Sequence, residues 1–229
     1  MDAWAPVASF ENVLYDRKWK KFRKRARLFR HIPFVELVFG AGSMAVGGVH
    51  KDSDFDVLLR ARQGRIWSAR FFSVFAFGML GWRRKKLTHD EAASDKVCLN
   101  HFVTARSLML SPPRTASWRT LYARLVPLYG SPEAVQAFFD ANASWMGGRR
   151  VYEDDLRHEH RAPSRLKRGI ERILSGRSGN ILERVLRSVQ VALIRQNLHS
   201  PEVGTAPRIV YTDDELEFHP DTRRMYRGA

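Results

Sequence analysis

The sequence predicts an α+β protein, with a small mixed β-sheet, helices on one side of that sheet and a further helical region after it. Three observations support this fold class. Short apolar runs at 34–39, 55–60 and 96–104 have the length of strands. Longer apolar or amphipathic segments at 12–31 and 66–80 have the length of helices. Beyond a pair of prolines near the middle of the chain, the apolar spacing is mainly helical.

Residues 1–110 are expected to form a first domain that begins with a basic helix. In the segment 12–31, apolar residues recur at roughly helical spacing between lysines and arginines, and Pro33 ends the pattern. We interpret the basic side as the solvated face of an amphipathic helix. A helix that tracks phosphates, or one that lies on a membrane surface, is the alternative.

Residues 111–229 are expected to form a mainly helical C-terminal region, because Ser111-Pro112-Pro113 marks a boundary. Ser131 and Pro132 have the residue types of an N-cap and a first helical position. The tail from Glu202 to Ala229 holds the short runs Arg208-Ile-Val-Tyr and Phe218-His-Pro. The predicted helices of this region are 115–126, 131–144, 164–175 and 179–198.

Composition restricts the partners and the compartment. The chain has 229 residues and a net charge of +15, from 39 Lys and Arg against 24 Asp and Glu. Such a field attracts polyanions such as nucleic acid or nucleotides. The single cysteine, Cys98, excludes an internal disulfide and is most simply a small buried residue. The apolar stretch 71–82 is too short to span a bilayer, and we find no signal peptide. We therefore expect a cytoplasmic protein without stable membrane insertion.

The most informative stretch joins a glycine turn to two aspartates. Gly42-Ser43 is followed, after a ten-residue spacer, by Asp54-Phe55-Asp56. Side chains two apart on a strand share a face, so Asp54 and Asp56 repel each other unless a cation lies between them. Mg²⁺ is commonly held by one or two carboxylates together with substrate phosphates. Gly42 lets the backbone approach a phosphate, the Ser43 hydroxyl can bind one, and Lys51 in the spacer can reach a triphosphate.

This motif resembles the signature of the polymerase-β-type nucleotidyltransferase superfamily, especially its minimal bacterial and archaeal members. The similarity covers about residues 30 to 105. It implies that Asp54 and Asp56 bind Mg²⁺, or Mn²⁺, and a nucleoside triphosphate, for which we expect ATP or CTP. The superfamily pattern also has a third carboxylate on a later strand, which helps to bind the catalytic metal and activates the acceptor hydroxyl. The predicted strand 96–104 contains no acid, so Asp95, directly before it, is the candidate third catalytic residue.

The expected activity is transfer of a nucleoside monophosphate from a nucleoside triphosphate to a hydroxyl acceptor. The acceptor is RNA, such as a tRNA end, or a protein, since minimal members of this superfamily include antitoxins that adenylylate a partner toxin. If the third acid is missing, the alternative is a catalytically weak module that binds a nucleotide or RNA. A membrane-surface protein that uses the basic helix would leave the motif unexplained. The oligomeric state stays open.

Two further groups of residues have alternative interpretations. The consecutive residues Arg83, Arg84, Lys85 and Lys86, beside Trp82, can contact nucleic acid or can form a solvated loop. Cys98, with His89 and His101, lacks the spaced second cysteine pair of a zinc motif, so the sequence argues against zinc there.

Overall fold

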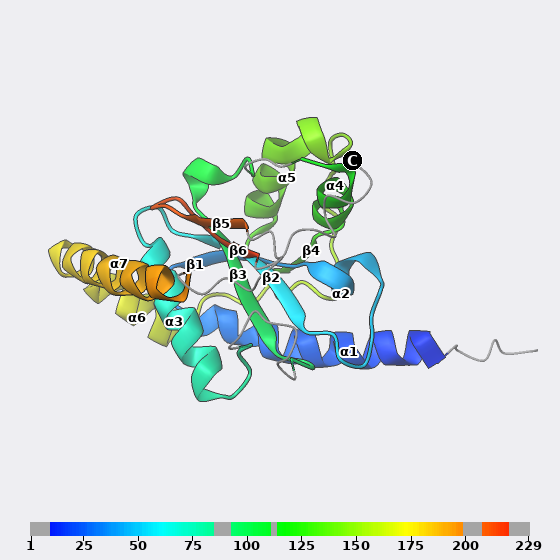
Figure 1. Ribbon diagram of the computed structural model, residues 1–229, viewed down its shortest axis with the longest axis horizontal. Coiled ribbons are helices and arrows are strands. Elements are labelled where there is room, and N and C mark those ends of the chain that lie inside the picture. The colour runs from blue at the N-terminus through cyan, green and yellow to red at the C-terminus, as the bar shows by residue number, and fades with distance from the viewer. Residues whose placement is uncertain (1–9, 85–92, 111–113, 199–207, 220–229) are drawn as a thin grey trace, which may run out of the picture.

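The computed structural model describes residues 10–84, 93–110, 114–198 and 208–219, and it has the predicted α+β fold. The strands form one mixed sheet in the order β4-β1-β2-β3-β6-β5 (Figure 1). Only the central pair, β2 and β3, is parallel, and every other neighbouring pair is antiparallel. The strands are β1 Val35–Gly40, β2 Phe55–Ala61, β3 Val97–Val103, β4 Val126–Tyr129, β5 Arg208–Tyr211 and β6 Glu215–His219.

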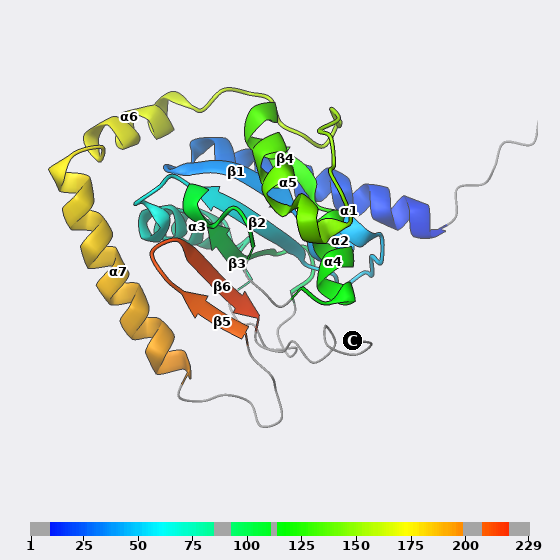
Figure 2. The same ribbon diagram turned by 90° about the horizontal axis from the view of Figure 1, so that it is seen from above.

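One face of the sheet is covered by helices from both ends of the chain. The core on this face joins buried residues of the N-terminal helices to residues of α3 and α7 (Figures 1 and 2). The helices of the first half therefore lie on one side of the sheet, as expected. On this side lie α1 Phe10–Ala26, the 3-10 helix η1 Arg27–His31, α3 Ile66–Met79, α6 Arg165–Ile173 and α7 Arg177–Leu198.

The opposite face is covered by α4 Ala116–Ala123 and α5 Pro132–Met146. Trp118 and Tyr122 of α4, and Phe138 and Phe139 of α5, pack in a second core against Phe39 of β1 and its neighbours. The carboxylates of the motif lie on this second face, because the residues that alternate with them, such as Phe55, belong to the first core. The short elements α2 Gly42–Val46 and η2 Ala105–Ser107 complete the described secondary structure.

The C-terminal region completes the sheet as well as adding helices. Strand β4 pairs with β1 at one edge, and β6 pairs with β3 on the other side. The expected boundary at residue 110 therefore divides the chain but does not divide the sheet. No helix within the described ranges is long and apolar enough to cross a bilayer.

The predicted helix 115–126 is too long by a few residues. Helix α4 ends at Ala123, and the chain then enters the edge strand β4, which contains Pro127. A proline has no backbone N–H to donate, so it fits an edge strand better than a helix interior. The predicted N-cap of the next helix is confirmed, because the Ser131 side chain accepts a hydrogen bond from the Ala134 N–H at 3.2 Å.

The basic N-terminal helix anchors the loop that precedes the motif aspartates. Its apolar side is buried, as the spacing predicts, and includes Trp19 and Phe22. Lys18 is also buried, and its ammonium group donates hydrogen bonds to the carbonyl oxygens of Lys51 at 2.6 Å and Ser53 at 2.8 Å. Part of the basic face is therefore structural, because it holds the 51–53 loop against the domain.

Candidate functional site

The glycine turn and the two aspartates meet at one end of the antiparallel pair β1–β2. Gly40 at the end of β1 lies opposite Val57 in the strand register. The Ala41 N–H then donates to the Asp56 carbonyl oxygen at 2.9 Å. The turn that begins at Gly42 is thereby held directly beside Asp56.

Gly42 is required by this close approach. Its φ is +64°, in the left-handed region that glycine adopts without a steric cost. A Cβ atom at this position would overlap Oδ2 of Asp56 and would lie 2.9 Å from its Cγ. From the sequence, we explain this glycine by the close approach of a phosphate. In the structure, the group that lies against Gly42 is the Asp56 carboxylate.

Asp54 and Asp56 form a close group with Cys98. One potential ligand atom from each of the three residues lies within 4.8 Å of the others. The parallel register puts Cys98 of β3 directly beside Asp56 of β2. The sequence favours Cys98 as a small buried residue and argues against zinc there; the signal for a site role is its place on the strand where the superfamily that the motif resembles has an acid.

The electrostatics of this group disfavour two ionised carboxylates side by side. Burial, and next the charge of Asp54, raise the pKa of Asp56 to about 7, while Arg84 and a hydrogen bond with Cys98 act in the opposite direction. Burial and the two carboxylates raise the pKa of the Cys98 thiol well above its ordinary value. The thiol therefore stays protonated, and the two carboxylates are the ionisable ligands of the group.

Arg84 lies inside this site. Its Nη1 donates to Oδ2 of Asp54 at 2.7 Å, and both side chains are largely buried. The position is fixed by the backbone, since the Arg84 N–H donates to the Val97 carbonyl oxygen at 3.0 Å. Burial lowers the pKa of Arg84, but Asp54 more than compensates, so the pKa is raised overall.

Of the other residues of the predicted basic contact, the structure describes only Arg83. Arg83 forms an isolated parallel bridge with Val97, and its charge adds to burial in lowering the pKa of Arg70 to about 10. Lys85 and Lys86 lie outside the described residues. The structure thus brings Arg84 to the aspartates. That all four basic residues contact nucleic acid stays a prediction.

Asp95 faces the basic N-terminal helix. Its backbone has φ +63°, and its carboxylate pairs with Lys18 at 3.1 Å and with Lys21. Arg25 donates to its carbonyl oxygen. Burial raises the pKa of Asp95, but the two lysines outweigh it and lower the pKa. Within the described residues, the group around Asp54 and Asp56 does not include this carboxylate.

The remaining predicted nucleotide-binding residues lie close by in the chain. Ser43 is half-buried in α2, where its carbonyl oxygen accepts the Gly47 N–H at 3.0 Å and closes the helix. Lys51 is exposed, and its backbone is fixed by the Lys18 ammonium group.

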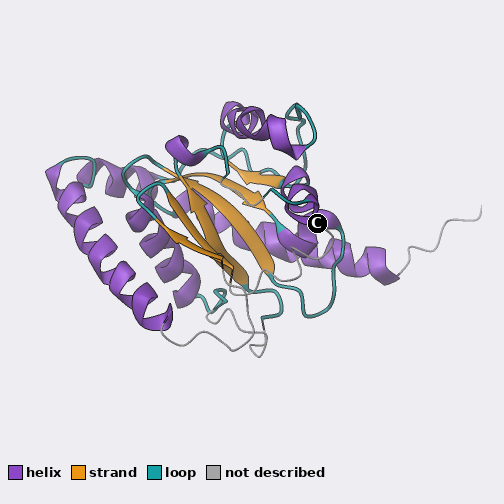
Figure 3. Cartoon of the chain, turned by 45° about the horizontal axis from the view of Figure 1, so that its top comes forward, coloured by secondary structure: helices purple, strands orange, loops and turns teal. Residues whose placement is uncertain are grey.

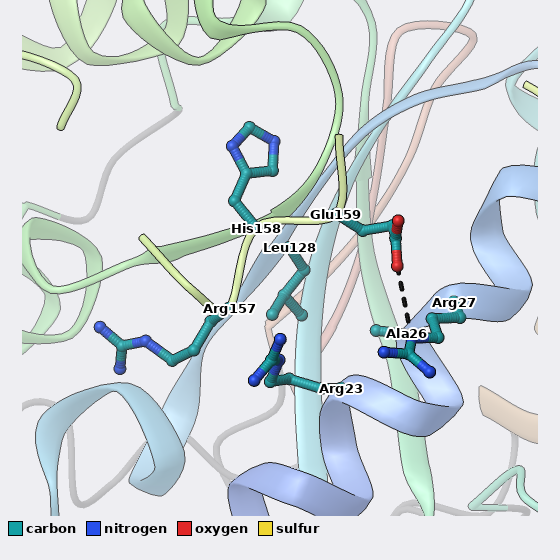
Figure 4. A pocket seen from close by; sticks show the side chains of 7 residues that line it. All are labelled: Arg23, Ala26, Arg27, Leu128, Arg157, His158 and Glu159. Carbon is teal, nitrogen blue, oxygen red and sulfur yellow. Dashed lines mark ion pairs between the residues drawn. The ribbon is translucent and has the colours of Figure 1, made fainter. Parts of the chain in front are cut away.

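A small pocket elsewhere on the molecule is lined by none of these residues. It lies between the N-terminal helix and the segment 157–159, and Arg27 and Glu159 form an ion pair of 3.3 Å at its edge (Figure 4). Its lining residues are Arg23, Ala26, Arg27, Leu128, Arg157, His158 and Glu159.

Comparison of the chain with family models, with curated proteins and with solved structures found no match.

Proposed function

We propose that the protein is a nucleotidyltransferase that uses Mg²⁺, or Mn²⁺, to transfer a nucleoside monophosphate from a nucleoside triphosphate to a hydroxyl acceptor. The observation that carries this proposal is the packing of Gly42 on the Asp56 carboxylate, with Asp54 in the same group. A glycine turn next to paired carboxylates suits a metal-bound triphosphate, because backbone N–H groups can bind phosphates and carboxylates can hold the metal.

Asp54 and Asp56 fit a divalent cation because two carboxylates so close together are under electrostatic strain. The raised pKa of Asp56 records part of that strain, and the Arg84 guanidinium already supplies a positive charge on the Asp54 side. When bound, the cation would neutralise the triphosphate and polarise the phosphorus that is attacked.

The residues around the two aspartates would orient the triphosphate. We expect the start of the turn at Gly42 and the Ser43 hydroxyl to bind phosphate oxygens, since both lie at the beginning of α2. Arg84 is adjacent to Asp54, so it can exchange its carboxylate partner for a phosphate oxygen when the nucleotide enters. Lys51, whose backbone is fixed by Lys18, adds a cation on the neighbouring loop.

The charge of the protein favours an RNA acceptor, such as a tRNA end. The net charge is +15, and the outer side of α1 exposes a row of basic residues that includes Arg17, Lys20 and Lys24. Phosphate contacts from lysine and arginine supply most of the affinity of such interfaces. We place this activity in the cytoplasm, with ATP or CTP as the nucleotide, and a protein acceptor of the antitoxin type remains the alternative substrate.

A second candidate function is nucleotide or RNA binding without transfer. It is favoured by the placement of Asp95 among Lys18 and Lys21, and by Cys98 in place of a third acid beside Asp56. A protonated thiol cannot take the proton of an acceptor hydroxyl, so the chemical step would be slow.

Incubation with each α-³²P-labelled nucleoside triphosphate, a divalent cation and total RNA tests the proposal. The enzyme should label RNA, or a protein in the acceptor-protein version of the assay, and an Asp54→Asn/Asp56→Asn variant should not. Stabilisation of the fold by the nucleotide without label transfer would support the binding module. If the nucleotide gives no label transfer and no stabilisation of the fold, both candidates are overturned.

A further inference from the structure

A second cluster of metal-ligating side chains lies on the same face of the sheet, where β3 meets β6. His101 of β3 is directly opposite Glu217 of β6 in the antiparallel register. His219 is two residues further along β6, so it points to the same face as Glu217. One potential ligand atom from each of these three residues lies within 4.8 Å of the others. Figure 3 shows the sheet, and two of the three residues, Glu217 and His219, lie on its strand β6.

The three side chains are more deeply buried than ordinary surface groups. The exposed fractions of the side chains are 4% for His101, 2% for Glu217 and 13% for His219. Buried charges in proteins are paired or coordinate metals, because an isolated charge loses its hydration. Two imidazoles and a carboxylate buried together therefore need a specific explanation.

Glu217 and His219 direct potential metal-ligand atoms toward each other. Arg208 Nε donates to one oxygen of Glu217 at 2.6 Å. The other oxygen lies 3.2 Å from Nε2 of His219. That nitrogen is buried, and within the described residues it makes no aligned hydrogen bond. A neutral His219 ring with its proton on Nδ1 would present the Nε2 lone pair to an ion shared with Glu217.

His101 has neighbours of the kind that orient metal ligands. Its Nδ1 lies 3.0 Å from the Tyr122 hydroxyl, and its Nε2 lies 3.3 Å from Oε1 of Glu215. The Tyr122 hydroxyl on Nδ1 is an outer-shell partner of the type that fixes the ring orientation and tautomer of a ligating histidine, and Nε2 would exchange Glu215 for the ion.

We propose that His101, Glu217 and His219 bind a divalent transition-metal ion of the Zn²⁺ class. Imidazole nitrogen together with one carboxylate suits Zn²⁺, whereas Mg²⁺ prefers oxygen ligands alone. The ion connects β6 to β3, and through β6 it holds the β5–β6 hairpin to the rest of the sheet. This site is separate from the aspartate pair and does not depend on the activity proposed above.

Another possible ligand group is less suited to the role. Asp154, His158 and His160 also have ligand atoms within 4.8 Å of one another, but Asp154 and His160 are exposed. This group therefore provides a matched control in the same chain.

Co²⁺ titration of the full-length, chelator-treated protein tests the proposal, because Co²⁺ bound to nitrogen ligands gives visible absorption bands. We expect one saturable site that gives these bands, with the bands lost on displacement by Zn²⁺. His219→Ala and Glu217→Gln should each weaken Co²⁺ binding by more than about 100-fold, beyond the ~10–100-fold that the loss of an outer-shell partner costs. His160→Ala and Asp54→Asn should leave the bands unchanged, and circular dichroism checks that each variant is folded.

The outcomes separate cleanly. Absence of Co²⁺ absorption in the wild-type chain overturns the site, as does a spectrum that survives His219→Ala or disappears with His160→Ala. If His219→Ala fails to fold, Glu217→Gln, which preserves the shape of the side chain, decides the question on the same criterion. A spectrum lost only with Asp54→Asn would assign the ion to the aspartate pair and would also overturn this proposal.

Discussion

The backbone of Gly42 lies directly against the carboxylate of Asp56, and a Cβ atom added to this residue would overlap Oδ2. The contact links the turn after β1 to the start of β2, two segments that are separated by the whole spacer of the motif. It requires glycine at position 42 and holds the turn beside the carboxylates.

Gly42→Ala should therefore be costly for two reasons. A left-handed φ costs about 1–2 kcal/mol for an L-residue, and the overlap with Asp56 adds about 1–3 kcal/mol. Gly47→Ala is the control, since Gly47 has φ +92° but no atom within 4 Å of an added Cβ. Urea unfolding should show a clearly larger loss for position 42, and equal losses at the two positions would contradict the account.

Asp56→Asn should remove metal binding while stabilising the fold at alkaline pH. The pKa of Asp56 is raised to about 7, so the native state binds a proton more tightly than the unfolded state. Stability is therefore lost as pH rises from about 4 to about 7, and the loss is complete above that window. An asparagine removes this penalty, and we expect a gain on the order of 1–3 kcal/mol at pH 8.

The measurement is urea unfolding of the wild-type protein and of this variant at pH 5 and pH 8. The advantage of the variant should be greater at pH 8. Asp52→Asn, at an exposed position in the same loop, serves as the control and should show little change. A variant less stable than wild type at pH 8 would refute the strain assigned to the aspartate pair.

Arg84→Gln should raise the affinity of the site for a metal ion in the absence of nucleotide. Arg84 holds Asp54 at 2.7 Å in a largely buried pair, and the net contribution of such a hydrogen bond is roughly 1 kcal/mol. Without that competition, Mn²⁺ should bind about 3–10-fold more tightly, while the affinity for a metal-bound triphosphate should fall. Calorimetric titration measures both, with Arg119→Gln on the exposed side of α4 as the control. Unchanged Mn²⁺ affinity would show that Arg84 does not compete for the site.

Asp95→Asn separates a catalytic role from a structural one. Asp95 is bound by Lys18 and Lys21, so its replacement should cost about 1–3 kcal/mol of stability at pH 7. The lowered pKa means that this contribution is present above the unfolded pKa and is lost as pH falls through the folded pKa. Asparagine tolerates the positive φ of this position, so no new backbone strain is expected.

The test compares urea unfolding with label transfer. A stability loss at pH 7 that shrinks at acidic pH, with transfer retained, supports the structural role. Full stability with transfer abolished would restore Asp95 as the third catalytic carboxylate.

The central strands and the motif turn could be predicted from the sequence because their signals are local. Strand β2 alternates Asp56 with the buried Phe55 and Val57, which is the period-two pattern of a half-buried strand. Strand β6 gave no such signal. It buries Glu215 and Glu217, which a sequence pattern assigns to solvent.

Which residues come together in the site depends on contacts that no local sequence pattern specifies. Cys98 meets Asp56 through the register of two parallel strands. Asp95, three residues earlier, is turned toward α1 by its positive φ and by Lys18, which is distant in sequence. His101 and His219 come together only because the C-terminal tail returns to pair with β3.

The most direct test of the central claim is a count of Mn²⁺ bound to the chain at pH 8, measured by electron paramagnetic resonance. At this pH the Asp56 carboxylate is ionised, since its pKa is about 7. We predict that wild type binds a Mn²⁺ ion that both Asp54→Asn and Asp56→Asn lose, and that ATP tightens this binding. Equal Mn²⁺ binding by wild type and by the two folded variants would contradict it.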